Sequence, residues 1–192
     1  MNQATIDILT LEGHAGALNS ACFSPDESLI LTASSDKTAR IWSLPGGNEQ
    51  TRLVGHNGSV TSGRFSPDGK RVVTSSLDRT ARVWQLPEGK LLFQLQGHTD
   101  TVQSASFSPD GRYIVTASQD GNAHLWNSNT GQLLRKLSGH SGGIQSAEFS
   151  TNSQQILTAS DDRTILLWDI EKEDSPKLFS GHNSGVTHAR FA

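Results

Sequence analysis

A single spacing of 42 residues runs through this sequence and decides what the chain can fold into. The dipeptide Gly-His occurs five times at that step, at Gly13-His14, Gly55-His56, Gly97-His98, Gly139-His140 and Gly181-His182. Three further residue types keep the same step: Trp42, Trp84, Trp126 and Trp168; Asp36, Asp78, Asp120 and Asp162; and Phe23, Phe65, Phe107, Phe149 and Phe191. No insertion separates four full units. Self-similarity at this period indicates a repeat architecture.

Within a unit, the pattern is typical of short β-strands. In the first unit a short run ends at Phe23 and is followed by a turn at Ser24-Pro25-Asp26, where proline pre-sets the backbone. The small, apolar stretch 30–34 comes next, then a polar turn around Asp36, the stretch 39–42 and a last short strand that ends at Leu53. No helical period of 3.6 residues is present. Each unit is therefore predicted to form a four-stranded antiparallel sheet, which cannot bury both faces alone and must stack on its neighbours.

These residues resemble the WD-repeat (tryptophan–aspartate repeat) β-propeller family. The unit length, the Gly-His opening and the Asp six residues before each Trp carry the resemblance over essentially the whole chain. It implies an all-β fold, a β-propeller of four-stranded antiparallel blades. The predicted repeats span residues 13–54, 55–96, 97–138 and 139–180, with a partial blade at 181–192 and a lone N-terminal strand at 6–11. There are two departures: the Asp after Trp occurs only at Asp169, and the fourth unit has Ser150-Thr151-Asn152 where the first three have Ser-Pro-Asp.

The length of the chain does not match a whole number of repeats. Its 192 residues hold about 4.6 units, and propellers of this kind have about four to eight blades. We expect residues 1–192 to be a segment of a larger propeller. A small closed ring and self-association of chains to complete a propeller are the alternatives.

Composition excludes several classes of protein. The net charge of −3 and the pI near 6.1 argue against a partner such as nucleic acid or a membrane surface, which favours a basic surplus. The single cysteine excludes an internal disulfide and a multi-thiolate zinc site. The first residues lack the basic flank and apolar block of a secretion signal. We therefore expect a cytoplasmic protein without a metal site or a cofactor.

A histidine, a hydroxyl and an aspartate recur together in every unit, and these are the chemical parts of a nucleophilic triad. The resemblance implies a structural role instead: Asp orients His, His meets the Thr hydroxyl, and Thr receives the indole N–H of Trp. Such a chain gives each buried polar atom a partner, and four copies of one catalytic site in a small chain would be unusual. We therefore predict no catalytic residue. The predicted structural network comprises His14, Thr32, Asp36 and Trp42; His56, Thr74, Asp78 and Trp84; His98, Thr116, Asp120 and Trp126; and His140, Thr158, Asp162 and Trp168.

The turn between the second and third strands and the loop before the first strand open onto one face of a propeller, which the resemblance makes the partner surface. The candidate contact residues there are Lys37, Leu77, Arg79, Gln103, Gln119, Gln145, Asp161 and Arg163. Leu77 is the one apolar anchor, and the three cations suit an acidic partner. His124, which shares its column with Arg40 and Arg82, is predicted on an exposed strand face.

The function favoured by these observations is that of a non-catalytic scaffold that binds other proteins. One alternative is the sensor or regulatory repeat array of a larger multidomain kinase or nucleotide-switch ATPase. Another is a propeller enzyme with a site in the central channel, although no acid pair or cluster of metal ligands recurs where the blades would converge.

Overall fold

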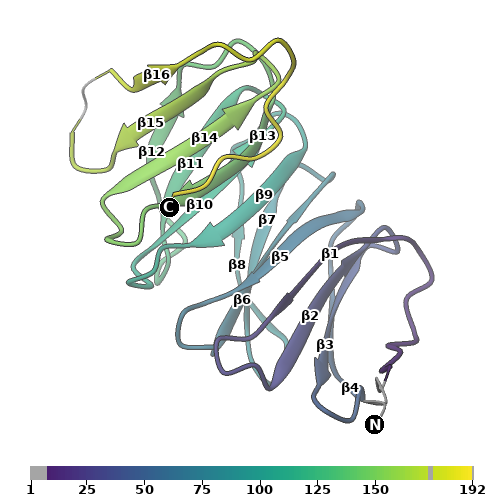
Figure 1. Ribbon diagram of the computed structural model, residues 1–192. Helices are drawn as coiled ribbons and strands as arrows, with labels where there is room; N and C mark the ends of the chain where they lie inside the picture. The colour runs from purple at the N-terminus through teal and green to yellow at the C-terminus, as the bar shows by residue number, and fades with distance from the viewer. Residues whose placement is uncertain (1–7, 173–174, 192) are drawn as a thin grey trace, which may run out of the picture.

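The computed structural model describes residues 8–172 and 175–191, and within them every regular element is a β-strand (Figure 1). No helix in these residues is long and apolar enough to cross a membrane. The sixteen strands form four separate sheets of four strands each. We refer to these sheets as blades 1 to 4 in chain order. The all-β fold and the antiparallel four-stranded blades predicted from the sequence are confirmed.

Strand order within each blade follows the chain, so each blade is a simple antiparallel meander. Blade 1 contains β1 (Leu18–Phe23), β2 (Leu29–Ser34), β3 (Thr38–Ser43) and β4 (Glu49–Val54). Blade 2 contains β5 (Val60–Phe65), β6 (Arg71–Ser76), β7 (Ala81–Gln85) and β8 (Lys90–Leu95). Blade 3 contains β9 (Val102–Phe107), β10 (Tyr113–Ser118), β11 (Asn122–Asn127) and β12 (Leu133–Ser138). Blade 4 contains β13 (Ile144–Phe149), β14 (Gln155–Ser160), β15 (Ile165–Asp169) and β16 (Lys177–Phe179).

The turn between the first two strands keeps its hydrogen bonds in blade 4, although the Ser-Pro-Asp sequence is absent there. In blade 1, the Ser24 hydroxyl donates to Asp26 at 2.6 Å and accepts the backbone N–H of Leu29 at 2.9 Å. In blade 4, the Ser150 hydroxyl donates to the side-chain oxygen of Asn152 at 2.7 Å and accepts the N–H of Gln155 at 3.0 Å. The asparagine amide oxygen thus takes the place of the carboxylate, and the hairpin keeps its shape.

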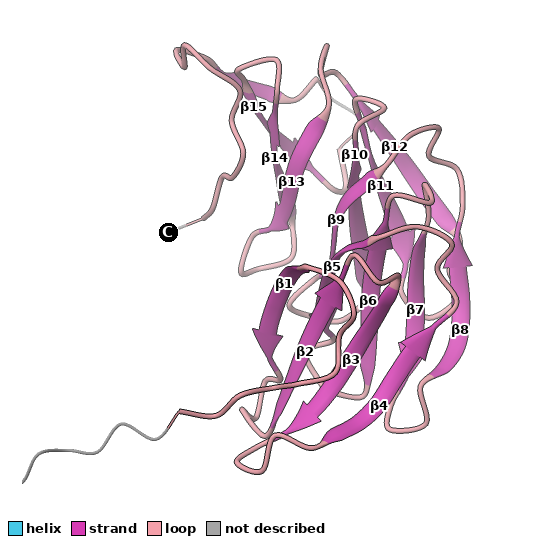
Figure 2. Cartoon of the chain, turned by 90° about the vertical axis from the view of Figure 1, so that its right-hand side faces the viewer, coloured by secondary structure: helices cyan, strands magenta, loops and turns pink. Residues whose placement is uncertain are grey.

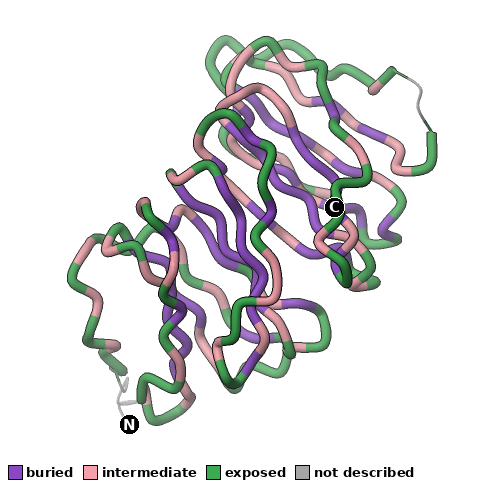
Figure 3. The backbone as a smooth tube through the Cα atoms, turned by 180° about the vertical axis from the view of Figure 1, so that it is seen from behind, coloured by how far each residue is buried: buried purple, intermediate pink, exposed green. Residues whose placement is uncertain are grey.

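The hydrophobic core lies between the blades rather than within any one of them. One cluster fills each gap between adjacent blades: Leu31, Ile41 and Leu53 meet Val60, Val72 and Trp84; Val73, Val83 and Leu95 meet Val102, Ile114 and Trp126; and Val115, Leu125 and Leu137 meet Ile144, Ile156 and Trp168. Figure 3 shows the buried strands running through the middle of the stack, with exposed loops at both edges. Since the same columns of residues meet at each gap, every interface repeats the one before it.

The stack of blades curves but does not close on itself (Figure 2). The two outermost faces therefore keep apolar side chains that the interior interfaces bury. Leu18 on blade 1 is 57% exposed, whereas Val60 in the same column of blade 2 is fully buried. On the far side of blade 4, Phe179 is 40% exposed, whereas Leu95 in its column is 1% exposed. The structure is thus an open arc of four propeller blades and not a closed four-bladed ring.

The two partial blades predicted at the ends do not form strands in the described residues. No strand is present over residues 8–11 or 181–191, and residues 6 and 7 of the predicted N-terminal strand lie outside the described part. A strand needs a hydrogen-bonded neighbour, and neither segment has the middle strands of its own blade beside it. The N-terminal segment nevertheless lies where the last strand of a preceding blade would lie, because Leu9 and Leu11 contact Gly47 as Thr51 and Leu53 of β4 contact Gly89. At the other end, the N–H of Val186 donates to the carbonyl of Ser160 at 2.9 Å.

Candidate functional site

Each blade holds a hydrogen-bonded chain of four side chains, here called the His–Asp–Thr–Trp network. In blade 2, Nδ1–H of His56 donates to Asp78 at 2.8 Å, the Thr74 hydroxyl lies 2.8 Å from Nε2 of His56, and the indole N–H of Trp84 donates to Thr74 at 2.9 Å. The other three blades repeat this geometry: the His–Asp distances are 2.7, 2.9 and 2.8 Å, and every His–Thr distance is 2.8 Å. The structure thus brings together all sixteen residues assigned to the network.

The carboxylate at the end of each network also holds two turns in place. In blade 2, one oxygen of Asp78 accepts the backbone N–H of Asn57, and the other accepts the N–H and the hydroxyl of Thr80 at 3.0 and 2.6 Å. The hydroxyl of Ser76 accepts the N–H of Asp78 and donates to the carbonyl of Gly58. Sequence reasoning did not single out these threonine and serine columns. Their hydroxyls recur at the 42-residue step, and that recurrence was the signal for them, although blade 3 has Asn122 in place of the threonine.

The hydrogen bonds keep the network aspartates ionised. Burial by itself would raise the pKa of Asp78, but the bonds from Thr80, Asn57 and His56 outweigh it and lower the pKa to about 2. The pKa values of Asp120 and Asp162 are also lowered to about 2, against the effect of burial, by the same kinds of bond. Burial lowers the pKa of His56 and of His98, which favours the neutral imidazole. In blades 2 and 3 the network therefore joins one carboxylate, one neutral imidazole, one hydroxyl and one indole.

The arrangement has the order of a nucleophilic triad, yet the hydroxyl is closed to a substrate. Thr74, Thr116 and Thr158 are fully buried and Thr32 is 2% exposed. Each of these hydroxyl oxygens already accepts an indole N–H. In blades 2, 3 and 4 a substrate carbonyl would have to enter the blade to reach this oxygen. In blade 1, His14 and Thr32 line a cavity of about 340 Å³, but Thr32 itself is only 2% exposed there. This geometry supports a structural role for the network.

Blade 3 differs from the others in one buried residue, and here the sequence-based prediction was wrong. His124 is 2% exposed and its ring stacks on that of His98, with 3.8 Å between the ring centroids. Neither ring nitrogen of His124 has a hydrogen-bond partner among the described residues. The column that led to the prediction is itself buried, because Arg40 and Arg82 are 5% and 8% exposed. Arg40 lies over the Trp42 ring and pairs with Glu49 at 2.7 Å.

The eight candidate contact residues lie at the loop edge or at the start of the first strands. In every blade, the turn after the second strand is bonded to the loop before the first strand, as when the N–H of Leu77 donates to the carbonyl of Ser59 at 3.0 Å. Five of the eight are exposed, namely Lys37, Leu77, Arg79, Asp161 and Arg163, and three are half-buried, namely Gln103, Gln119 and Gln145. Gln145 donates to Asp161 at 2.7 Å, which places these two together.

The three cations of this group share an unusual backbone conformation. Lys37, Arg79 and Arg163 have φ values of 71°, 69° and 71°, in the left-handed region that glycine adopts most readily. Blade 3 has Gly121 at this position, with φ 79°. Three blades therefore carry a long cationic side chain where the backbone conformation favours glycine.

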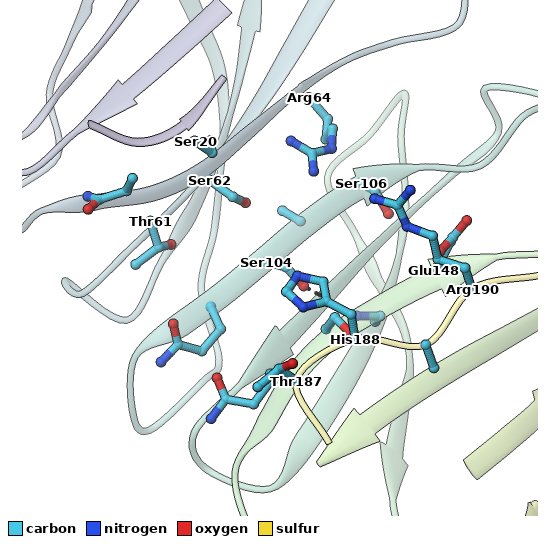
Figure 4. Close-up of a pocket in the computed structure, with 17 residues that line it drawn as sticks. Ser20, Thr61, Ser62, Arg64, Ser104, Ser106, Glu148, Thr187, His188 and Arg190 are labelled. Carbon is cyan, nitrogen blue, oxygen red and sulfur yellow. Dashed lines mark hydrogen bonds between the residues drawn. The ribbon is translucent and has the colours of Figure 1, made fainter. Parts of the chain in front are cut away.

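The first strands of all four blades line a cavity of about 490 Å³ together with residues 187–190 (Figure 4). Its wall is mixed: Thr61, Ser62, Ser104 and Gln103 lie beside alanines such as Ala105 and Ala147. One column of the repeat forms part of this wall: Arg64, Ser106, Glu148 and Arg190. Sequence reasoning gave this column no role because it accepts charged residues. Within the described residues, no group of three or more His, Cys, Asp or Glu side chains is placed to hold a metal ion.

Comparison with known proteins agrees with this geometry. The family model described as "WD domain, G-beta repeat" matches four stretches that cover most of the chain: residues 6–43, 47–85, 89–127 and 131–169. A curated relative, the WD40 repeat-containing protein HOS15 of Arabidopsis thaliana, is 45% identical over 42 residues. That alignment covers 22% of this chain and 7% of the relative, so the shared segment has the length of a single repeat.

Proposed function

The chain belongs to the WD40-repeat family, and we propose that it acts as a non-catalytic scaffold that binds other proteins. Repeats of this family generally mediate protein–protein interactions. The partner surface in this proposal is the loop edge that carries Lys37, Leu77, Arg79, Asp161 and Arg163.

One observation carries the proposal: the polar side chains inside the blades bond to one another, while those at the loop edge are exposed. The four networks use their His, Asp, Thr and Trp groups internally. At the loop edge, Leu77 is 51% exposed and is flanked in sequence by Asp78, whose carboxylate fixes the turn. The cations at that edge are held in the left-handed conformation, and strain of this kind is found at functional sites. A partner with acidic side chains around an apolar contact fits this surface.

The experiment is quantitative affinity capture with two matched variants. The first variant carries Lys37→Gly, Arg79→Gly and Arg163→Gly, which removes the cations and places glycine where Gly121 already stands in blade 3. The second carries Lys70→Gly, Arg112→Gly and Lys90→Gly, which removes the same charge from exposed positions elsewhere. We expect the first variant alone to lose the partners that the parent chain captures. Equal capture by the parent and the first variant would contradict the proposed surface.

A second proposal concerns self-association, and the exposed outer faces support it. Leu18 and Phe23 on blade 1 are 57% and 61% exposed, and Phe107 and Phe149 in the column of Phe23 are 8% and 5% exposed. Each interior interface joins the far face of one blade to the near face of the next. We propose that the far face of blade 4 in one copy of the 192-residue chain packs on blade 1 of a second copy. Its test is described with the whole molecule below.

A further inference from the structure

The cavity lined by the first strands contains two arginines whose charge no carboxylate among the described residues neutralises at contact distance. Arg64 comes from β5 and Arg190 from the segment after blade 4, and Figure 4 shows both side chains at the cavity. Neither takes part in any of the ion pairs within 4.0 Å among the described residues. Arg64 donates to the carbonyl of Gly63 at 2.8 Å, which leaves most of its N–H groups for another partner.

A hydroxyl in the same column also lacks a partner. The oxygen of Ser106 is shielded from solvent, and no hydrogen-bond partner is present for it among the described residues. Buried polar atoms are usually bonded, so an isolated one in the wall of a cavity points to a missing group. Ser106, Arg64 and Arg190 occupy one position of the 42-residue repeat, and they therefore face the cavity at the same level.

The repeat column that contains Arg64 and Arg190 has a net positive charge, although the net charge of the whole chain is negative. The column contains Cys22, Arg64, Ser106, Glu148 and Arg190, with two cations and one carboxylate, whereas the whole chain has a net charge of −3. The guanidinium groups present flat, paired donors that fit carboxylate and phosphate oxygens. The volume of about 490 Å³ lies within the range of small-molecule sites.

We propose that this cavity binds a small ligand through a carboxylate or phosphate group held by Arg64 and Arg190, and that binding uncovers the Ser106 hydroxyl as an additional donor. Glu148 opposes the ligand electrostatically and limits the affinity of the site. Polar residues such as Gln103 and Ser104 and the alanines Ala105 and Ala147 line the rest of the cavity, so the remainder of the ligand meets both polar and apolar side chains. The cations of this site differ from those of the loop edge proposed for protein partners, although Gln103 and Gln145 belong to both the candidate contact residues and the cavity wall.

The test is an NMR titration of the 192-residue chain with inorganic phosphate and, separately, with glutarate. We expect amide shifts at Gly63 and Ser106, and the probe with the lower Kd identifies the oxyanion that the site prefers. Arg64→Gln and Arg190→Gln should each weaken binding by about two- to fivefold, as expected for the loss of one solvent-accessible ionic contact. Glu148→Gln should strengthen binding, because it removes the opposing charge.

Arg112→Gln is the matched control, since it removes one exposed positive charge away from the cavity. The amide spectrum of each variant shows whether the blades remain folded. The proposal is overturned if neither probe shifts these amides, if Arg112→Gln weakens binding as much as the cavity variants do, or if Glu148→Gln weakens it.

Discussion

At the scale of single residues, the aspartate of each network stabilises a blade through several bonds at once. Asp162 accepts bonds from His140, Thr164 and the N–H of Ser141. We expect Asp162→Ala to lower the free energy of unfolding by about 2–4 kcal/mol, because buried donors lose a charged partner. Its neighbour Asp161 is exposed, so Asp161→Ala should change stability by less than about 0.5 kcal/mol. Urea denaturation of the two variants makes the comparison, and equal midpoints would refute the structural role of the network.

The buried His124 should make stability depend on pH. Burial first, and then the neighbouring His98, lower the pKa of His124 to about 4, from an ordinary value of 6.5. The unfolded chain therefore binds the proton more readily, so stability is complete above about pH 6.5 and is lost as the pH falls toward 4. Asp120 and Lys136 are the other charged groups that act on this ring.

Replacing His124 by the residues found in its column tests this dependence. His124→Leu, as at Leu166, and His124→Arg, as at Arg40, should each reduce the stability lost between pH 7 and pH 4.5 by about 2 kcal/mol. The network aspartates act in a lower window, since their lowered pKa values give stability that is lost only below about pH 4. The measurement is urea unfolding at both pH values. An unchanged pH dependence in both variants would show that His124 does not carry it.

The networks could be predicted from the sequence through its resemblance to the WD-repeat family, which implies such a chain in every blade and gives each buried polar atom a partner. The burial of His124 could not. An arginine column is usually exposed. Arg40, however, lies over the Trp42 ring, and Arg40 and Arg82 each lie beside a glycine that also meets the tryptophan of their blade, a tertiary contact with no local signature. The unpaired Arg64 and Arg190 were missed for a related reason: a column that tolerates either charge can face a cavity as well as open solvent.

At the scale of the strand and the blade, stability should depend on position in the arc more than on residue type. Leu95 and Phe179 share one column, but only Leu95 is covered by a following blade. In a Leu18→Asp background, which removes the proposed contact between copies, we expect Leu95→Ala to cost about 2–4 kcal/mol and Phe179→Ala to cost less than about 1 kcal/mol, although phenylalanine is the larger side chain. Urea unfolding of both variants decides this. Equal losses would mean that the face of blade 4 is covered in solution.

The sixteen strands of the full blades follow from alternation, turn residues and the repeat itself. The strands predicted in the partial blades at the two ends are not formed. A strand is stable only beside another strand, and the residue pattern of one segment does not show whether such a neighbour is present. The fourth turn also shows that chemistry matters more than residue identity, since Asn152 supplies the oxygen that Asp26 supplies in blade 1.

At the scale of the whole molecule, the outer faces predict association of the 192-residue chain. Light scattering over a range of concentrations should give a molar mass of at least twice 20.7 kDa. Leu18→Asp and Phe179→Asp each place a charge on one outer face and should shift the mass toward that of one chain. Leu77→Asp is the control, because Leu77 is exposed at the loop edge instead. A constant mass of one chain for the parent would contradict self-association.

An open arc is the shape expected of a segment of a larger propeller, but its curvature could not be predicted from the sequence, because the angle between blades depends on how side chains of unequal size fit at each gap. The sameness of those gaps has a consequence for how such a chain can grow. A tandem copy of residues 97–138 inserted after Ser138 would present the same near face to blade 3 and the same far face to blade 4, so lengthening needs no new kind of contact. Each duplication would extend the arc by one blade, so a closed propeller could arise by repeat duplication without a new type of blade–blade interface.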